Sequence, residues 1–388
     1  MKKRILSALM VLALCLTLLP TVALAAEAEG TEHKHPICGK TDCTDSSHVL
    51  PSEGTWKSVS SLNDITEAGH YYLTDNVTLG GTWMPQKNIT LDLNGKTITA
   101  NVDFAAICVI DGVTFTLCDC KGTGKITHEQ GKTGSGVYMS GGEFHMYGGS
   151  ITGNTANVGG GVYMPGGQFT MYGGSITKNT AEKSNNNGGN GGGVYVGGGE
   201  FTMSGGTIGG TNDGEANTAK YGGGVYVGGN NSTFTMSGSA SITNNTAMGN
   251  DKGTGAGVYV NGGTFTMSGG TISGNTTDST DGGVCVAGAT FTMSGGKITG
   301  NTAISYSGGV GVHNSATFIM SGGTIGGTNS GEANKANYGG GVNVDQYGKF
   351  EMSGGEISGN KANQNGGGVY VYGGTFEMSG DASIIKTR

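Results

Sequence analysis

A polar segment near the amino end carries the residue types that bind transition metals. Residues 31–48 hold three of the seven histidines and two of the seven cysteines: His33, His35, Cys38, Cys43 and His48. Imidazole and thiolate are ligands that zinc prefers, and short spacings let a small knuckle wrap one ion. The spacing between Cys38 and Cys43 is wider than that of most paired zinc ligands, so a disulfide between them in an exported tail is the alternative. We expect no required cofactor, and zinc in this leader is the one candidate.

A second candidate is a file of tyrosines at one position of a repeated phrase. Its members are Tyr138, Tyr163, Tyr195, Tyr226, Tyr259 and Tyr370, and other residues take this position in the remaining copies: Cys108, Cys285, Gly311 and Asn343. We expect these side chains, the two cysteines included, to point outward. A ladder of exposed aromatic rings on a flat sheet could stack against sugar rings. The alternative is structural, because tyrosine favours strands and like residues stack across neighbouring strands.

Carboxylates offer a third kind of chemistry. Glu351 and Glu377 occupy the same position in successive copies and could share a cation or a proton; solvated surface acids are the simpler interpretation. Polysaccharide cleavage needs a carboxylate pair, or calcium-binding acids with a basic residue on one face. Elsewhere the acids are scattered, and no arginine lies between Arg4 and Arg388. We therefore expect a protein that is not an enzyme, with polysaccharide lyase or hydrolase activity as a remote alternative.

The elements that would position these residues come from an internal repeat. From about residue 134, nine copies follow one another, and residues 105–127 are a degenerate earlier copy. Each copy has three apolar stations, such as Val194 and Val196, then Phe201 and Met203, then Ile208, with glycine pairs between them. Alternation of period two buries one side of each short strand. Three such strands can bury their apolar sides by closing into a triangular coil and stacking on the next coil.

Asparagine recurs at a fixed place in these copies. It follows the isoleucine by three residues at Asn154, Asn179, Asn245, Asn275, Asn301 and Asn360, and resumes after a matched insertion at Asn217 and Asn334. Stacked in register, these side chains can form an amide ladder between coils. The sequence thus predicts an all-β, right-handed, single-stranded parallel β-helix of about ten coils over residues 105–388.

The amino-terminal region differs from the repeats in composition and pattern. Residues 1–25 combine a basic start, an apolar stretch and a small-residue cleavage site, which is typical of a secretory signal peptide. Residues 26–55 form the Cys/His-rich leader. Residues 56–104 contain both tryptophans and alternating segments, and we expect an amino-terminal cap and the first irregular coils there. The chain stops at Arg388 inside a shortened copy, so we expect it to continue or its last coil to pair with something.

These repeats resemble those of right-handed parallel β-helix proteins of the pectate-lyase-like class, especially the repeats of polymorphic outer membrane proteins and adhesins. Gly160-Gly-Val162 and Gly223-Gly-Val225 match one element of that signature, and Ile151-Thr-Gly-Asn154 matches the other, with isoleucine where the signature has phenylalanine. The resemblance covers residues 105–388 without an autotransporter barrel. It implies an adhesin-like, secreted or surface-attached protein.

The charge and hydropathy of the chain limit the classes of partner that it can bind. Loss of Lys2, Lys3 and Arg4 with the signal peptide would take the formal net charge from −7 to −10. An acidic chain without basic clusters is unsuited to nucleic acid, which requires neutralised phosphates. We expect an extracellular scaffold whose partners are glycans or cell-surface proteins, with a carbohydrate-binding module as the alternative. We expect no membrane-spanning segment after signal cleavage, and a monomer or end-to-end association.

Overall fold

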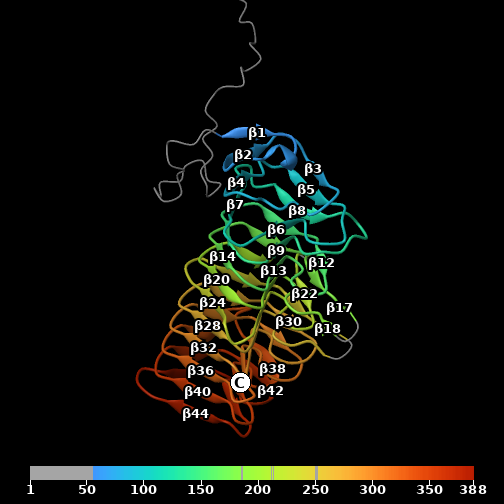
Figure 1. The fold of residues 1–388 in the computed structure, drawn as a ribbon. Helices are drawn as coiled ribbons and strands as arrows, with labels where there is room; N and C mark the ends of the chain where they lie inside the picture. Colours follow the sequence, from blue (N-terminus) through green and yellow to red (C-terminus); the bar gives the residue numbers. More distant parts are fainter. Residues whose placement is uncertain (1–55, 185–186, 211, 213, 250–251) are drawn as a thin grey trace, which may run out of the picture. The chain divides into compact units, whose positions relative to one another are not determined.

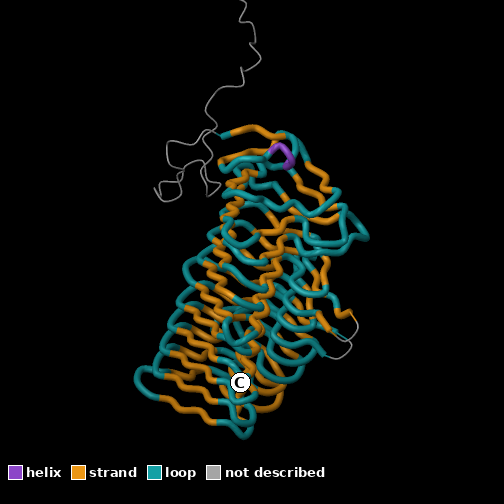
Figure 2. The backbone as a smooth tube through the Cα atoms, in the orientation of Figure 1, coloured by secondary structure: helices purple, strands orange, loops and turns teal. Residues whose placement is uncertain are grey.

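Each repeat forms one coil of a parallel β-helix. The computed structural model describes residues 56–184, 187–210, 212, 214–249 and 252–388, all within one compact unit, His35–Arg388. Successive coils stack so that equivalent strands lie side by side, from β1 to β45 along the chain (Figure 1). The strands therefore gather into four all-parallel sheets, A to D, which confirms the predicted fold class. Figure 2 shows the strands in columns separated by turns, with one short helix near the amino end.

Sheet A carries the Phe-x-Met station and has thirteen strands. In order they are β1 (Lys57–Val59), β2 (Gly69–Leu73), β4 (Ile89–Asp92), β7 (Thr114–Cys118), β10 (Glu143–Met146), β14 (Gln168–Met171), β20 (Gly199–Met203), β24 (Ser232–Met236), β28 (Thr264–Met267), β32 (Thr290–Met293), β36 (Thr317–Met320), β40 (Lys349–Met352) and β44 (Thr375–Met378). A single 3₁₀ turn, η2 (Leu62–Asp64), follows β1.

Sheet B carries the isoleucine station and has twelve strands. In order they are β3 (Val77–Leu79), β5 (Thr97–Ala100), β8 (Lys125–His128), β11 (Ser150–Thr152), β15 (Ser175–Thr177), β21 (Thr207–Gly209), β25 (Ser241–Thr243), β29 (Thr271–Ser273), β33 (Lys297–Thr299), β37 (Thr324–Gly326), β41 (Glu356–Ser358) and β45 (Ser383–Ile385).

Sheet C carries the Val-x-Val station, with the tyrosine file between its valines, and has ten strands. In chain order they are β6 (Ile107–Val109), β9 (Val137–Met139), β13 (Val162–Met164), β19 (Val194–Val196), β23 (Val225–Gly228), β27 (Val258–Asn261), β31 (Val284–Ala287), β35 (Val310–His313), β39 (Val342–Val344) and β43 (Val369–Val371).

Sheet D, of eight mostly two-residue strands, was not expected. In order they are β12 (Thr155–Ala156), β16 (Thr180–Ala181), β22 (Thr218–Ala219), β26 (Thr246–Ala247), β30 (Thr276–Thr277), β34 (Thr302–Ala303), β38 (Lys335–Tyr338) and β42 (Lys361–Asn365). The coil therefore has a fourth short side where three sides were predicted. The reason is that the asparagine ladder holds the following residues in register, so they pair as strands. A small antiparallel hairpin, β17 (Lys183–Ser184) with β18 (Asn187–Gly188), extends from one coil.

The core is built from the three predicted apolar stations. Val194, Val196, Phe201, Met203 and Ile208 are all fully buried. The phenylalanines of sheet A pair in register and stack almost parallel, for example Phe265 on Phe291 with ring centroids 4.6 Å apart at 5°. Rings at this spacing fill the interior of each coil and contact the coils on both sides. Among the described residues, no helix is both long enough and apolar enough to cross a membrane.

The predicted asparagine ladder forms a continuous hydrogen-bonded column. Asn275 is fully buried, and its side-chain amide donates to Asn301 Oδ1 at 2.9 Å and to the Ile242 carbonyl at 3.0 Å. Its Oδ1 accepts from the backbone N–H and the side-chain amide of Asn245. The same bonds connect the asparagines from Asn154 to Asn360, so each side chain links its own coil to both neighbours.

Candidate functional site

The tyrosine file runs along sheet C, with its backbone in register. Five consecutive coils place their tyrosine rings 5.1–5.4 Å apart, and the pair Tyr195–Tyr226 is stacked at 4°. The members of this run are Tyr138, Tyr163, Tyr195, Tyr226 and Tyr259. Tyr370 stands apart, because Cys285, Gly311 and Asn343 interrupt the file, and it packs on Tyr338 instead.

The tyrosine file is half-buried. Tyr226 is 8% exposed, the other five members are intermediate in exposure, and burial raises the pKa values of Tyr195, Tyr226 and Tyr259. Side chains from the turns before sheet C supply part of the cover, because the ring of Tyr221 lies 5.3 Å from that of Tyr259. The side chains of Cys285 and Cys108 also point away from the coil interior. They are only 2% and 4% exposed, so other residues cover them as well.

The interruption of the file makes room for charged residues. Cys285, Gly311 and Asn343 follow Tyr259 on successive strands of sheet C. Gly311 leaves space at the centre, because a Cβ there would overlap Asp281 Oδ1 and His313 Nε2 and displace these side chains. A tyrosine at this place would fill the same space. Losing the ring therefore opens a position beside the sheet, and side chains from neighbouring coils occupy it.

His313 lies between two carboxylates in this opening. Its Nε2 is 3.0 Å from Asp281 Oδ1, and its Nδ1 is 2.9 Å from Asp345 Oδ2. The Asp281 side chain is 1% exposed and that of His313 is 16% exposed. Burial alone would lower the pKa of His313, but Asp281 and Asp345 outweigh it and raise that pKa to about 10. The imidazole is therefore positively charged at neutral pH when no other cation lies in the site.

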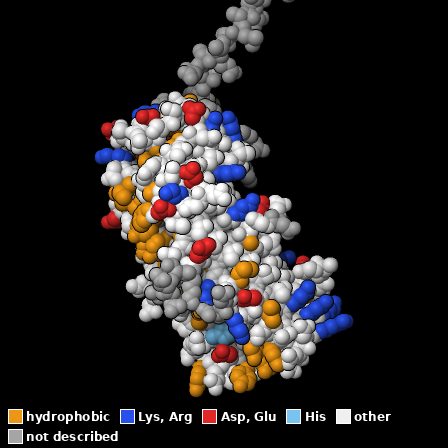
Figure 3. Space-filling model, turned by 90° about the vertical axis from the view of Figure 1, so that its right-hand side faces the viewer, with side chains coloured by type: hydrophobic (Ala, Val, Ile, Leu, Met, Phe, Trp, Pro, Cys, Tyr) orange, Lys and Arg blue, Asp and Glu red, His pale blue; other side chains and the backbone are white. Residues whose placement is uncertain are grey.

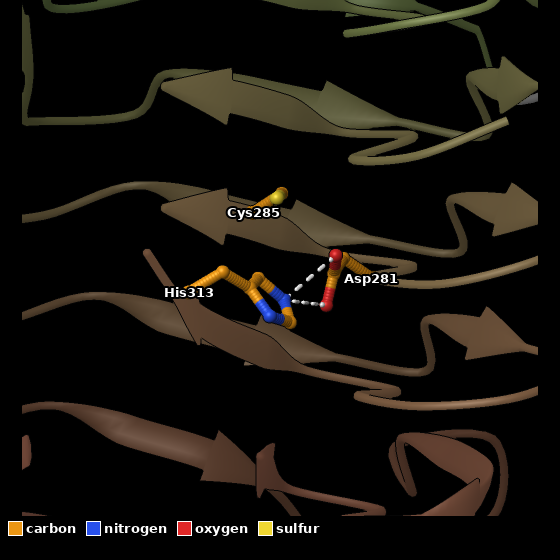
Figure 4. A group of neighbouring side chains, drawn as sticks. All are labelled: Asp281, Cys285 and His313. Carbon is orange, nitrogen blue, oxygen red and sulfur yellow. Dashed lines mark hydrogen bonds and ion pairs between the residues drawn. The ribbon is translucent and has the colours of Figure 1, made fainter. Parts of the chain in front are cut away.

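Cys285 completes a group of three ligand types. One ligand atom each from Asp281, Cys285 and His313 lies within 4.8 Å of the others, and Figure 4 shows the carboxylate facing the imidazole ring, with the cysteine on the neighbouring strand. Burial, followed by the charge and hydrogen bonding of Asp281, raises the pKa of the Cys285 thiol well above its ordinary value. Such a thiol is a poor nucleophile. The arrangement thus fits ion pairing or metal binding better than covalent catalysis.

Two hollows lie beside the tyrosine file. The first hollow, of about 260 Å³, is lined by Phe104, Tyr138 and Tyr163 with the acids Asp103 and Glu182. The second hollow, of about 400 Å³, contains the Asp281–Cys285–His313 group. Its wall includes four tyrosines, which are Tyr221, Tyr259, Tyr306 and Tyr372. Volumes of this order suit a small ligand or one residue of a larger one.

Hydrophobic side chains gather in two places on the face shown in Figure 3. One group follows an edge in the amino-terminal half and the other lies at the C-terminal end, while several Lys and Arg side chains gather at the opposite edge near the C-terminal end. Tyr372, in the last coil, is 64% exposed and lines the second hollow. Apolar groups gathered on a surface often mark an interaction site.

The other predicted positions add less. Glu351 and Glu377 are paired across sheet A as expected, but Lys349 forms an ion pair with Glu351, so the two acids do not stand alone. Residues 1–55 lie outside the described residues, and with them the predicted signal peptide, the leader and its five predicted zinc ligands.

Sequence reasoning missed Asp281 and His313 as candidate site residues. The available signal was the loss of tyrosine in three successive copies, together with an aspartate at a coil-start position that is glycine in most copies. Comparison of this chain with models of known protein families, with curated proteins and with solved structures found no match.

Proposed function

We propose that this chain is an extracellular, adhesin-like scaffold that binds its partner through the two hollows beside the tyrosine file. The proposal rests on the contrast between columns of residues that stay the same from repeat to repeat and a column that does not. The phenylalanine and asparagine columns run unbroken through the repeats. The tyrosine file, by contrast, is interrupted, and the residues around it vary from coil to coil.

This contrast separates the scaffold from the surface that is free to differ. The buried core and the asparagine column hold the stack, so outward positions of sheet C can differ without weakening it. The first hollow has aromatic rings and carboxylates, and the second has tyrosines, a histidine and a cysteine. Two chemically different hollows along one sheet suit a partner that is long and polar, such as a glycan or a cell-surface protein.

A secretory signal over residues 1–25 supports a location outside the cell, and the acidic composition favours partners other than nucleic acid. Expression of the full chain, followed by amino-terminal sequencing of the exported product, tests the location. Cleavage near Ala25 with the protein outside the cell is expected. Retention of the intact chain in the cytoplasm would refute it.

Binding is tested with the exported protein on immobilised glycans and on whole cells. Tyr138→Ala alters the first hollow and Tyr306→Ala the second, and Tyr347→Ala removes an exposed tyrosine that lines neither. Loss of an aromatic contact weakens binding by about 5- to 30-fold, since it removes about 1–2 kcal/mol. We expect this for at least one hollow variant and no change for Tyr347→Ala. Unchanged binding in both hollow variants would exclude the two hollows as the binding site.

A carbohydrate-binding module is the second candidate, and the first hollow favours it. Phe104 lies 5.8 Å from Tyr138, and the two rings line the same hollow as Asp103 and Glu182. Aromatic faces with hydrogen-bonding carboxylates are suited to sugar rings. Soluble oligosaccharides that compete with whole-cell binding would favour this candidate. Competition by cell-surface protein alone would favour the adhesin-like scaffold.

A further inference from the structure

Three coils depart from the repeat together, and their departures meet at one point. Asp281 takes a coil-start position that is glycine at Gly255 and Gly339, and it does so at φ 64°, which a non-glycine residue rarely adopts. Cys285 replaces a tyrosine four residues later. His313 ends the next strand of sheet C, in register with Ala287. Independent surface changes would not be expected to converge on one buried spot.

The three side chains form a set of metal ligands. Carboxylate oxygen, thiolate sulfur and imidazole nitrogen are all ligands of zinc, and a site with three protein ligands leaves the fourth position for water or a substrate. We propose that Asp281, Cys285 and His313 bind a divalent transition metal of the zinc class in the second hollow, with one coordination position open. This proposal does not depend on the binding function proposed above.

Asp345 supplies the contact that orients the histidine. It lies one coil beyond His313 and accepts from Nδ1 at 2.9 Å, which leaves Nε2 directed toward Asp281. A carboxylate on the far nitrogen fixes the tautomer and ring orientation of metal-bound histidines. Asp345 is therefore a positioning residue, and it is not one of the three proposed ligands.

A buried polar atom beside the group has no partner. Asn343, which is 2% exposed and lines the second hollow, has no hydrogen bond to its Oδ1 within the described part of the chain. The buried hydroxyl of Ser307, at the coil-start position that follows Asp281, is likewise unpartnered there. An unsatisfied buried polar atom costs about 1–3 kcal/mol. A water on the open position of a metal would give Asn343 a donor.

The geometry requires only small adjustments. Tetrahedral zinc with ordinary bond lengths holds its ligand atoms about 3.3–3.8 Å apart. The atoms of this group lie within 4.8 Å of one another, and His313 Nε2 is 3.0 Å from Asp281 Oδ1. Binding replaces two protons, one on the Cys285 thiol and one on the His313 nitrogen that faces Asp281, and both are released to solvent. Soft thiolate with imidazole favours zinc over magnesium or calcium.

A nucleophilic cysteine and a purely structural ion pair are the two competing roles for this group. A nucleophilic cysteine would need a thiol that ionises easily, whereas burial and Asp281 oppose ionisation of Cys285. A purely structural Asp–His–Asp ion pair would account for His313, with the Cys285 thiol hydrogen-bonded to Asp281, but it leaves Asn343 Oδ1 unpartnered. Metal binding is the role that uses all of these residues.

The test uses the full mature chain with Cys38→Ser and Cys43→Ser, so that the leader offers no thiolate. Zinc and cobalt are titrated into chelator-treated protein, and cobalt reports thiolate ligation through a near-ultraviolet charge-transfer band. We expect one ion per chain, with this band. Cys285→Ser and His313→Gln should abolish the band and weaken binding more than ~100-fold, and Asp345→Asn should weaken it about 10–100-fold. Cys108→Ser is the matched control, because Cys108 has the same sheet C position without this aspartate and histidine, and it should change nothing.

Several results would overturn the proposal. Less than stoichiometric metal at micromolar concentrations, binding that Cys285→Ser leaves intact, or cobalt binding without a thiolate band would each do so. No metal binding combined with a lower melting temperature for His313→Gln would establish the structural ion pair instead. If a ligand variant does not fold, the cobalt band of the intact site and its displacement by zinc decide the question.

Discussion

Replacing Asn275 with alanine tests how the coils are held together. Its side chain takes part in four hydrogen bonds in a fully buried position between two other coils. Alanine removes all four. The backbone N–H of Asn245 loses its acceptor, and the carbonyl of Ile242 loses a donor, so the damage falls on backbone groups that water cannot reach.

The expected loss of stability in Asn275→Ala follows from these hydrogen bonds. Two buried backbone groups left unsatisfied cost about 1–3 kcal/mol each. The other two bonds join amides that keep a second partner, since Asn301 Oδ1 still accepts from the backbone N–H of residue 275 and Asn245 Nδ2 still donates to Ile208. These bonds add less. We expect Asn275→Ala to lower the free energy of unfolding by about 3–5 kcal/mol.

Equilibrium urea unfolding, followed by circular dichroism and by hydrogen exchange, measures this loss. Hydrogen exchange is needed because stacked repeats can unfold in parts. Thr276→Ala, at the next and exposed position, should change the unfolding free energy by less than ~0.5 kcal/mol. Asn275→Asp, which keeps the volume but places oxygen against oxygen, should cost at least as much as alanine at neutral pH. If Asn275→Ala costs no more than Thr276→Ala, the ladder does not hold the coils together.

Three further predictions follow from the same structure. Because burial raises the pKa of Tyr259, this tyrosine ionises at a lower pH in the unfolded chain than in the folded one, so its contribution to stability should be constant below about pH 10 and fall above it. Urea unfolding midpoints measured against pH should fall less steeply in Tyr259→Phe than in the parent chain. Parallel curves would contradict this. In Gly224→Ala the new Cβ would lie 2.6 Å from the Gly257 carbonyl oxygen of the next coil. The loss of unfolding free energy should therefore be several times larger than in Gly112→Ala, where nothing lies within 4 Å of the new Cβ and only the positive φ opposes alanine, at about 1 kcal/mol. Equal melting temperatures of the two variants would count against close packing of the coils. For the leader, metal analysis of a Cys285→Ser chain purified without chelator should find about one zinc; a Cys38–Cys43 disulfide with little zinc would refute the knuckle.

The scaffold was predictable because a repeat specifies its own environment. Val194, Phe201 and Ile208 recur at fixed spacings, and a period-two pattern leaves each of them one buried side. The asparagine ladder followed from the same argument, since residues at equal positions in stacked coils must be neighbours. The fourth sheet did not follow, because Thr-Ala pairs such as Thr246–Ala247 carry no distinctive strand pattern.

The candidate site was only partly predictable. The interruptions at Cys285, Gly311 and Asn343 were visible in the sequence. The contact of His313 with Asp281 and Asp345, each 32 residues away, was not visible, because coil lengths vary and an insertion lies between His313 and Asp345. Cover over the tyrosines depends on turn side chains such as Tyr221, whose positions no periodicity predicts.

Zinc-edge anomalous diffraction from crystals of the full mature chain grown with zinc tests most directly the claim that interruptions of this repeat build its functional site. The prediction is a peak in the second hollow within bonding distance of Asp281, Cys285 and His313, with Asp345 on the far nitrogen of the histidine. An empty second hollow, with His313 still held between its two carboxylates, would contradict it.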